Sequence, residues 1–118
     1  MSYTIYGIKS CNSVKKAFDY LNQAGLTYTF FDYKKTAPTV EKLQYWCDTL
    51  GWEVVLNKKG TTWRGLTDEV KASVVDAASA IVVMQAHTST IKRPIIEDAA
   101  GNVVLIGFDE EKYKTALS

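Results

Sequence analysis

Tyr3-Thr4-Ile5-Tyr6-Gly7-Ile8 is a short run with the alternation and β-forming residues of a strand, and Lys9-Ser10-Cys11-Asn12-Ser13 follows it as a polar turn. From Val14 onward the apolar residues recur at helical spacing, and Gly25 is placed to end that helix. Residues 26–33 are rich in aromatic and β-branched side chains and predict a second strand, joined to the first by a right-handed crossover. Strand, helix and strand in this order predict an α/β fold.

The rest of the chain predicts further helices and a late hairpin. A helix that begins at Pro38 and ends before Gly51 carries one apolar stripe, formed by Val40, Leu43, Cys47 and Leu50. The remaining expectations are an ordered functional loop over 56–66, helices over 67–71 and 76–86, a hairpin from 91–96 and 103–106, and a closing helix over 109–117. Ile81–Met84 alone is also typical of a buried strand, so that segment keeps two interpretations.

Composition narrows the class of protein. The 118 residues predict a single domain spanning 1–118. Fourteen basic and 13 acidic residues give a net charge of +1, which argues against a nucleic-acid partner. The chain lacks an apolar run of the roughly 18 residues that a membrane helix needs, and it lacks a secretory signal pattern, so we expect no membrane association and a cytoplasmic location. Cys11, Cys47 and His87 lack paired ligand spacing, so we expect no metal site.

Cys11 is the strongest candidate for a catalytic residue. At the entrance of a helix, unpaired N–H groups and the macrodipole favour a thiolate. Lowering a thiol pKa from about 8.5 to about 6 requires about 3.4 kcal/mol, whereas a helix end contributes about 2 kcal/mol at most. A further cation is therefore required. The alternative is that Cys11 is a small buried residue, which is the interpretation we prefer for Cys47 on its apolar stripe.

Arginines are better candidates for that cation than the lone histidine. His87 lies in a polar stretch and is more typical of the surface, whereas Arg64 and Arg93 are the only arginines of the chain. Arg93 also lies in an apolar run just before Pro94, where a charge needs a partner. Position 17 is alanine, so no phosphatase-type loop follows Cys11, and Val14 stands where a Cys-x-x-Cys pair would need its second cysteine. A resolving thiol must therefore come from another molecule.

Four motifs occur together in the chain, at Gly7–Lys16, Asp32–Lys34, Leu56–Arg64 and Ile91–Ile95. In this order the sequence resembles the arsenate-reductase-like (ArsC/Spx) family, most closely its YffB branch. The resemblance implies a thioredoxin-like α/β fold with a mixed sheet of about four strands and a helical insertion.

The resemblance also implies roles for individual residues. Cys11 would be the nucleophile, and Arg64 and Arg93 would bind the anion or thiolate. Pro94 would follow a cis peptide bond. Glutathione would bind at Asn12, Ser13, Arg93 and Pro94 as a co-substrate, with no tightly bound cofactor. The third arginine of arsenate reductases is missing, because residues 101–109 contain no basic side chain, and this puts arsenate in doubt as the substrate.

From this resemblance we expect the chain to be a glutathione-dependent thiol-disulfide reductase. Its partners would be glutathione, an oxidised small molecule or protein disulfide, and glutaredoxin. An alternative is an Spx-like redox-sensing regulator that binds RNA polymerase. Such regulators commonly carry a Cys-x-x-Cys switch, whereas in this chain Cys11 is followed by Asn12, Ser13 and Val14. A third interpretation is a catalytically silent scaffold in which Cys11 is buried.

Overall fold

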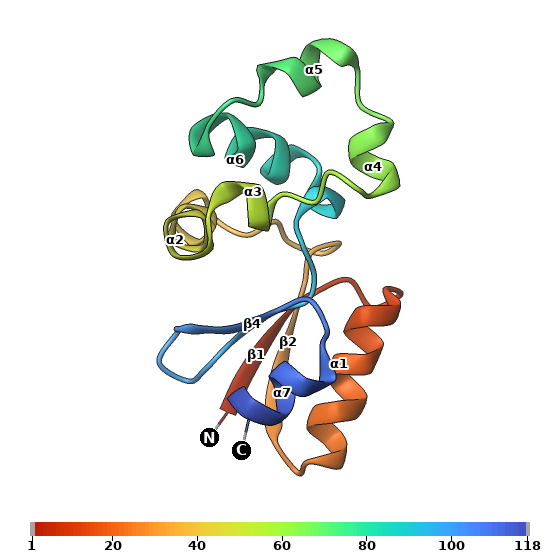
Figure 1. Cartoon of the computed structure of the whole chain (residues 1–118), viewed down its shortest axis with the longest axis vertical. Helices are drawn as coiled ribbons and strands as arrows, with labels where there is room; N and C mark the ends of the chain where they lie inside the picture. The colour runs from red at the N-terminus through yellow and green to blue at the C-terminus, as the bar shows by residue number, and fades with distance from the viewer. Residues whose placement is uncertain (1, 118) are drawn as a thin grey trace. The chain divides into compact units, whose positions relative to one another are not determined.

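One mixed sheet organises the first part of the structure. The computed structural model describes residues 2–117. Its strands are β1 (Ser2–Gly7), β2 (Thr27–Asp32), β3 (Ile95–Glu97) and β4 (Val103–Ile106), in the order β2-β1-β3-β4 (Figure 1). β1 runs parallel to β2 and antiparallel to β3, and β3 is antiparallel to β4. The expected α/β class and four-stranded mixed sheet are confirmed.

Two helices pack on one face of this sheet. α1 (Asn12–Gln23) and α7 (Glu110–Ala116) share a hydrophobic core with alternate residues of the strands. The buried members of this core are Tyr3, Ile5, Ala17, Leu21, Ile96, Leu105, Tyr113 and Leu117. The helical stripe after Val14 therefore supplies the contact between α1 and the sheet, as its spacing predicts.

The middle of the chain forms a second compact unit, residues 33–92, while residues 2–32 and 93–117 form the first. The second unit is helical and corresponds to the expected insertion. Its elements are α2 (Val40–Leu50), α3 (Trp52–Val55), α4 (Thr61–Arg64), α5 (Asp68–Ser73), α6 (Ala77–Ala86) and the short 3-10 turn η1 (Thr88–Thr90). α2 packs against α3 and α6, and Trp46 and Met84 are fully buried. That both units form one domain stays a prediction.

Local capping explains where the helices of this unit begin. The α2 helix starts at Val40 rather than Pro38, because the Thr39 side chain accepts a hydrogen bond from the N–H of Lys42 at 3.1 Å. In α6 the Asp76 carboxylate accepts the N–H of Ser79, and the Ser79 hydroxyl accepts the N–H of Asp76. This capping box begins a helix, so the strand interpretation of Ile81–Met84 is wrong.

Three other expectations need correction. Residues 56–66 are not all loop, since α4 begins directly after Gly60. The first strand of the hairpin is shorter than 91–96, because Ile91 forms a bridge with Leu56 and only Ile95–Glu97 join the sheet. Val40 keeps 47% of its surface exposed and so lies outside the buried stripe of α2. Within residues 2–117, no helix has both the length and the apolar character needed to cross a membrane.

Candidate active site

Cys11 lies at the junction of β1 and α1, in the position that the sequence predicts. It is the N-cap residue of α1, with extended backbone angles of φ −75° and ψ 129°. Its N–H donates to the carbonyl of Ile8 at 3.1 Å, and its carbonyl accepts the N–H of Lys15 at 3.0 Å. The side chain is partly exposed. The backbone therefore holds the thiol at the helix entrance within reach of a reaction partner, which is not the burial that a silent scaffold would show.

Several groups act on the protonation of this thiol. Burial is the largest single influence and raises the pKa of Cys11, whereas the backbone N–H groups of Val14 and Ser13 and the side chain of Arg93 lower it. The lowering influences together prevail, so the pKa of Cys11 lies below its ordinary value. The thiol makes no ordinary capping hydrogen bond. The stabilisation therefore comes from several weak donors and one cation, in line with the free-energy argument from the sequence.

The backbone around Arg93 and Cys11 is closely packed. The Arg93–Pro94 peptide bond is cis, as the resemblance implies. A Cβ atom on Gly7 would lie 2.6 Å from Cγ2 of Val14 and 3.6 Å from Cβ of Arg93. Only glycine lets the end of β1 approach α1 this closely without displacing Val14, whose N–H group acts on the thiol.

A chain of hydrogen bonds fixes the other side of Pro94. The Pro94 carbonyl accepts the N–H of Gly107 at 2.8 Å, and the Gly107 carbonyl accepts the hydroxyl of Tyr113 at 2.7 Å. Gly107 has φ 75°, a left-handed conformation that favours glycine. Tyr113 is fully buried in α7. The end of β4 and the last helix therefore both hold the segment that presents Arg93.

The other predicted site residues lie in two different units of the structure. Asn12 and Ser13 form the first turn of α1 beside Cys11, and Pro94 is buried, so these candidates for glutathione contact gather within the first unit. Arg64 is exposed and ends α4 in the second unit, where its carbonyl accepts the Lys71 ammonium at 2.9 Å. Its contact with the thiolate stays a prediction.

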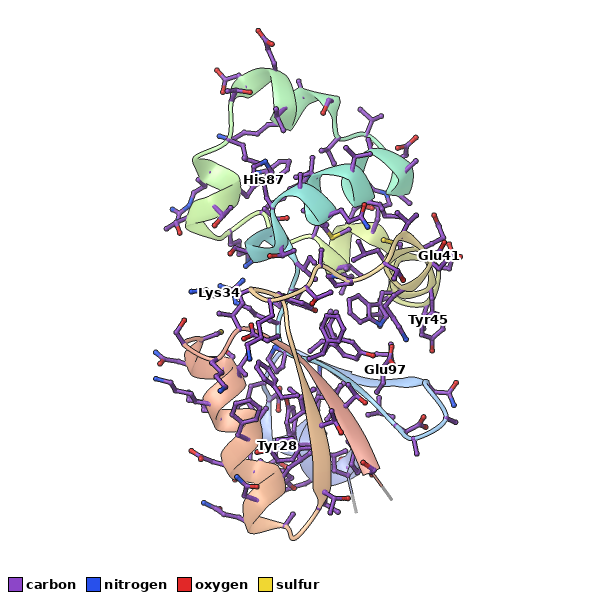
Figure 2. All side chains as sticks on the ribbon, turned by 180° about the vertical axis from the view of Figure 1, so that it is seen from behind. Tyr28, Lys34, Glu41, Tyr45, His87 and Glu97 are labelled. Atoms are coloured by element: carbon purple, nitrogen blue, oxygen red, sulfur yellow. The ribbon has the colours of Figure 1, made fainter. Side chains whose placement is uncertain are left out.

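Two further interpretations are confirmed. His87 is an exposed residue at the end of α6 (Figure 2). Cys47 is only 6% exposed, and burial raises its pKa, so it is a core residue rather than a second reactive thiol. Among residues 2–117, no three His, Cys, Asp or Glu side chains gather to hold a metal ion.

A buried polar pair was missed by sequence reasoning. Glu97, labelled in Figure 2, is 3% exposed, and its Oε1 atom accepts the hydroxyl of Tyr6 at 3.1 Å. Burial, followed by the charge of Glu97, raises the pKa of Tyr6. The predicted hairpin ends its first strand at residue 96 and leaves Glu97 in the turn, but Glu97 is the last residue of β3. Glu97 lies two positions after Ile95, and this spacing in a strand places both side chains on the same face, which is the signal that could have shown its burial.

Three features together define a class of protein: the sheet order, the crossover helix with a thiol at its N-terminus, and the cis proline. Comparison with known sequences identifies the family. The sequence model of the ArsC family matches residues 6–116, so the chain belongs to the ArsC family. It therefore has the expected thioredoxin-like fold of that family.

Individual proteins support the same assignment over nearly the whole chain. The solved structure of a protein named YffB has a TM-score of 0.90 and 42% sequence identity, covering 98% of this chain and 99% of that one. An arsenate reductase (ArsC) related protein from Brucella melitensis has a TM-score of 0.75 and 44% identity, covering 98% and 93%. An uncharacterised protein of Haemophilus influenzae is 37% identical over 115 residues, which cover 98% of both chains.

Proposed function

We propose that this ArsC-family protein is an oxidoreductase, a glutathione-dependent thiol-disulfide reductase with Cys11 as its single nucleophile. The observation that carries the proposal is a partly exposed thiol at the N-cap of α1, where the backbone N–H groups of Val14 and Ser13 and the side chain of Arg93 lower the pKa of Cys11 against the raising effect of burial. A lowered pKa increases the thiolate fraction at neutral pH, and the thiolate is the attacking species. Similarity to an arsenate reductase related protein at 44% identity supports the same class of chemistry.

The proposed cycle needs no second cysteine in the chain. The Cys11 thiolate attacks one sulfur of a mixed disulfide between glutathione and a small molecule or protein. A bond forms between Cys11 and the glutathione sulfur, the original disulfide bond breaks, and the substrate leaves as a thiolate. A second glutathione thiolate then attacks the glutathione sulfur bound to Cys11. Oxidised glutathione leaves and the Cys11 thiolate is regenerated, so one free glutathione thiol is oxidised for each mixed disulfide reduced.

The surroundings of Cys11 suit this substrate. Asn12 and Ser13 offer polar side chains at the start of α1, and the buried Pro94 follows Arg93 directly in the chain. Arg93 would stabilise the thiolate before attack and again when it is released as the leaving group. Arg64 would add a second positive charge, as the resemblance implies.

Arsenate is not the substrate we propose. Residues 101–109 contain no basic side chain, and an oxyanion adduct requires more positive charge than a thiolate does. The regulator alternative has less support, because Val14 occupies the position of the second cysteine of the redox switch.

The test is glutathione-dependent turnover of a glutathionylated substrate by purified protein. We expect Cys11→Ser to lose turnover, because the hydroxyl is not ionised at neutral pH. Cys47→Ser is the matched control, since Cys47 is the other cysteine and lies in a core; it should retain turnover if the protein remains folded by circular dichroism. Full turnover by Cys11→Ser would exclude Cys11 as the nucleophile.

A further inference from the structure

Residues 56–60, the part of the predicted functional loop that lies ahead of α4, have no role in the proposed reaction. In the second unit this segment lines a cavity of about 440 Å³. This volume is within the range of roughly 300–1,000 Å³ of small-molecule sites. The lining residues are Glu53, Val54, Leu56, Asn57, Lys58, Lys59 and Lys92. We call this site the lysine pocket.

Backbone pairing builds the lysine pocket from two distant segments. Leu56 and Ile91 form an antiparallel bridge. On either side of it, the N–H of Asn57 donates to the carbonyl of Thr90 at 2.7 Å, and the N–H of Lys92 donates to the carbonyl of Val55 at 2.7 Å. This pairing brings Lys92 into one cavity with Lys58 and Lys59. The convergence of the three lysines is therefore a property of the fold rather than of neighbouring positions in the sequence.

Contacts within the second unit position Lys58 and Lys59 in the lysine pocket. The ammonium of Lys58 lies 5.4 Å from the ring centre of Trp52 and 5.5 Å from that of Trp63, so two aromatic faces hold it. The side-chain oxygen of Asn57 accepts the N–H of Lys59 at 3.1 Å, which fixes the turn between them. Lysine side chains normally lose much rotamer freedom on binding. Holding Lys58 in advance reduces that cost.

The charges of the lysine pocket are unbalanced. Three ammonium groups line it together with one carboxylate, that of Glu53. Within residues 2–117, Lys58, Lys59 and Lys92 form no ion pair with a carboxylate. Like charges gathered in a cavity raise the local concentration of anions and are neutralised by binding one. Val54, which is 48% exposed, and Leu56 add an apolar wall.

From these observations we infer that the lysine pocket binds a small organic anion with at least two negative charges, carried by phosphate or carboxylate groups. Two or three ammonium groups would contact the charged groups, and Val54 and Leu56 would contact the carbon skeleton. This site lies within the second unit and uses no residue of the proposed cysteine chemistry, so it adds a binding activity to the protein.

Titration calorimetry at near-physiological salt tests the inference, with pyrophosphate and citrate as probes. We expect saturable binding of at least one probe, accompanied by a change in tryptophan fluorescence because Trp52 and Trp63 flank Lys58. Tighter binding of pyrophosphate would assign the site to phosphate-bearing ligands, and tighter binding of citrate would assign it to polycarboxylates.

Charge-neutralising variants locate the bound anion. Lys59→Gln and Lys92→Gln should each weaken binding about tenfold, the loss expected for a charge-assisted hydrogen bond. Lys35→Gln is the matched control, because Lys35 is an exposed lysine of the same unit outside the lysine pocket; it should bind as the wild type does. Absence of binding by both probes, or equal weakening by Lys35→Gln, would overturn the inference.

Discussion

Burial raises the pKa of Cys11, the backbone N–H groups of Val14 and Ser13 lower it, and Arg93 is the only side-chain cation among the groups that lower it. Removing its charge should raise the pKa of Cys11 towards the ordinary value of about 8.5. Below the pKa, each unit of increase reduces the thiolate fraction about tenfold. We therefore predict that Arg93→Ala slows alkylation of Cys11 at pH 6–7, with the pH–rate curve moved to higher pH.

The control for this measurement is the maximum rate at high pH, which should be similar in both proteins because the thiol is then fully ionised. Cys47→Ser provides a background in which only Cys11 reacts. Arg64→Ala measured in parallel shows whether the second arginine also acts on the thiolate. An unchanged pH–rate curve in Arg93→Ala would remove its proposed role in activation.

The Tyr6 hydroxyl supports a buried carboxylate rather than the thiol. Tyr6→Phe removes the 3.1 Å hydrogen bond to Glu97 while keeping the ring. A buried group that loses a partner costs about 1–3 kcal/mol, so we predict a decrease of that size in the free energy of unfolding by denaturant. Tyr28→Phe is the matched control, since the Tyr28 ring stacks on Phe18. Equal stability of wild type and Tyr6→Phe would show that the hydrogen bond contributes nothing.

The approach of β1 to α1 depends on the missing side chain of Gly7. In Gly7→Ala the new Cβ would lie 2.6 Å from Cγ2 of Val14, and a β-branched side chain in a helix has little freedom to move away. We predict a loss of about 1–3 kcal/mol in the free energy of unfolding, as for other overpacked cores. The pKa of Cys11 should also rise, because displacing Val14 moves its N–H group away from the sulfur.

A double-mutant cycle separates this contact from general damage. Val14→Ala removes the clashing methyl group at the cost of a cavity, since Val14 is fully buried. The double variant Gly7→Ala/Val14→Ala should therefore be more stable than the sum of the two single changes predicts. Additive effects would show that the Gly7–Val14 contact is not the cause.

The sequence predicts best those helices and strands whose position is determined by the pattern of their own residues. The spacing after Val14 predicts α1 and its core face, and the turn before it predicts the position of Cys11. The other features depend on pairing between segments that are far apart in the sequence, and a local pattern does not predict such pairing. Ile91 has the side chain of a strand residue, but its bridge to Leu56 keeps it out of the sheet. Glu97 and Gly107 likewise gain their roles from Tyr6 and Pro94, which are far away in the sequence.

The chain folds around a long insertion that interrupts the sheet between β2 and β3. The insertion brings its own ends together, because the carbonyl of Tyr33 accepts the hydroxyl of Thr88 at 3.3 Å. If it were unfolded, the first unit would have to close a loop of 60 residues, at an entropic cost of about 3–4 kcal/mol. Each unit is also near the size at which small domains become marginally stable. These two effects favour folding of both units together.

Tryptophan fluorescence can test this coupling, because Trp46, Trp52 and Trp63 are the three tryptophans of the chain and all lie in the second unit. Leu21→Ala creates a cavity in the first unit, where Leu21 is fully buried, and should cost about 2–5 kcal/mol. We predict that it lowers the denaturant midpoint read by tryptophan fluorescence together with that read by circular dichroism. Leu43→Ala, at a fully buried leucine of the second unit, should produce a comparable shift. A fluorescence midpoint that Leu21→Ala leaves unchanged would mean that the two units unfold separately, and the single-domain prediction would then be wrong.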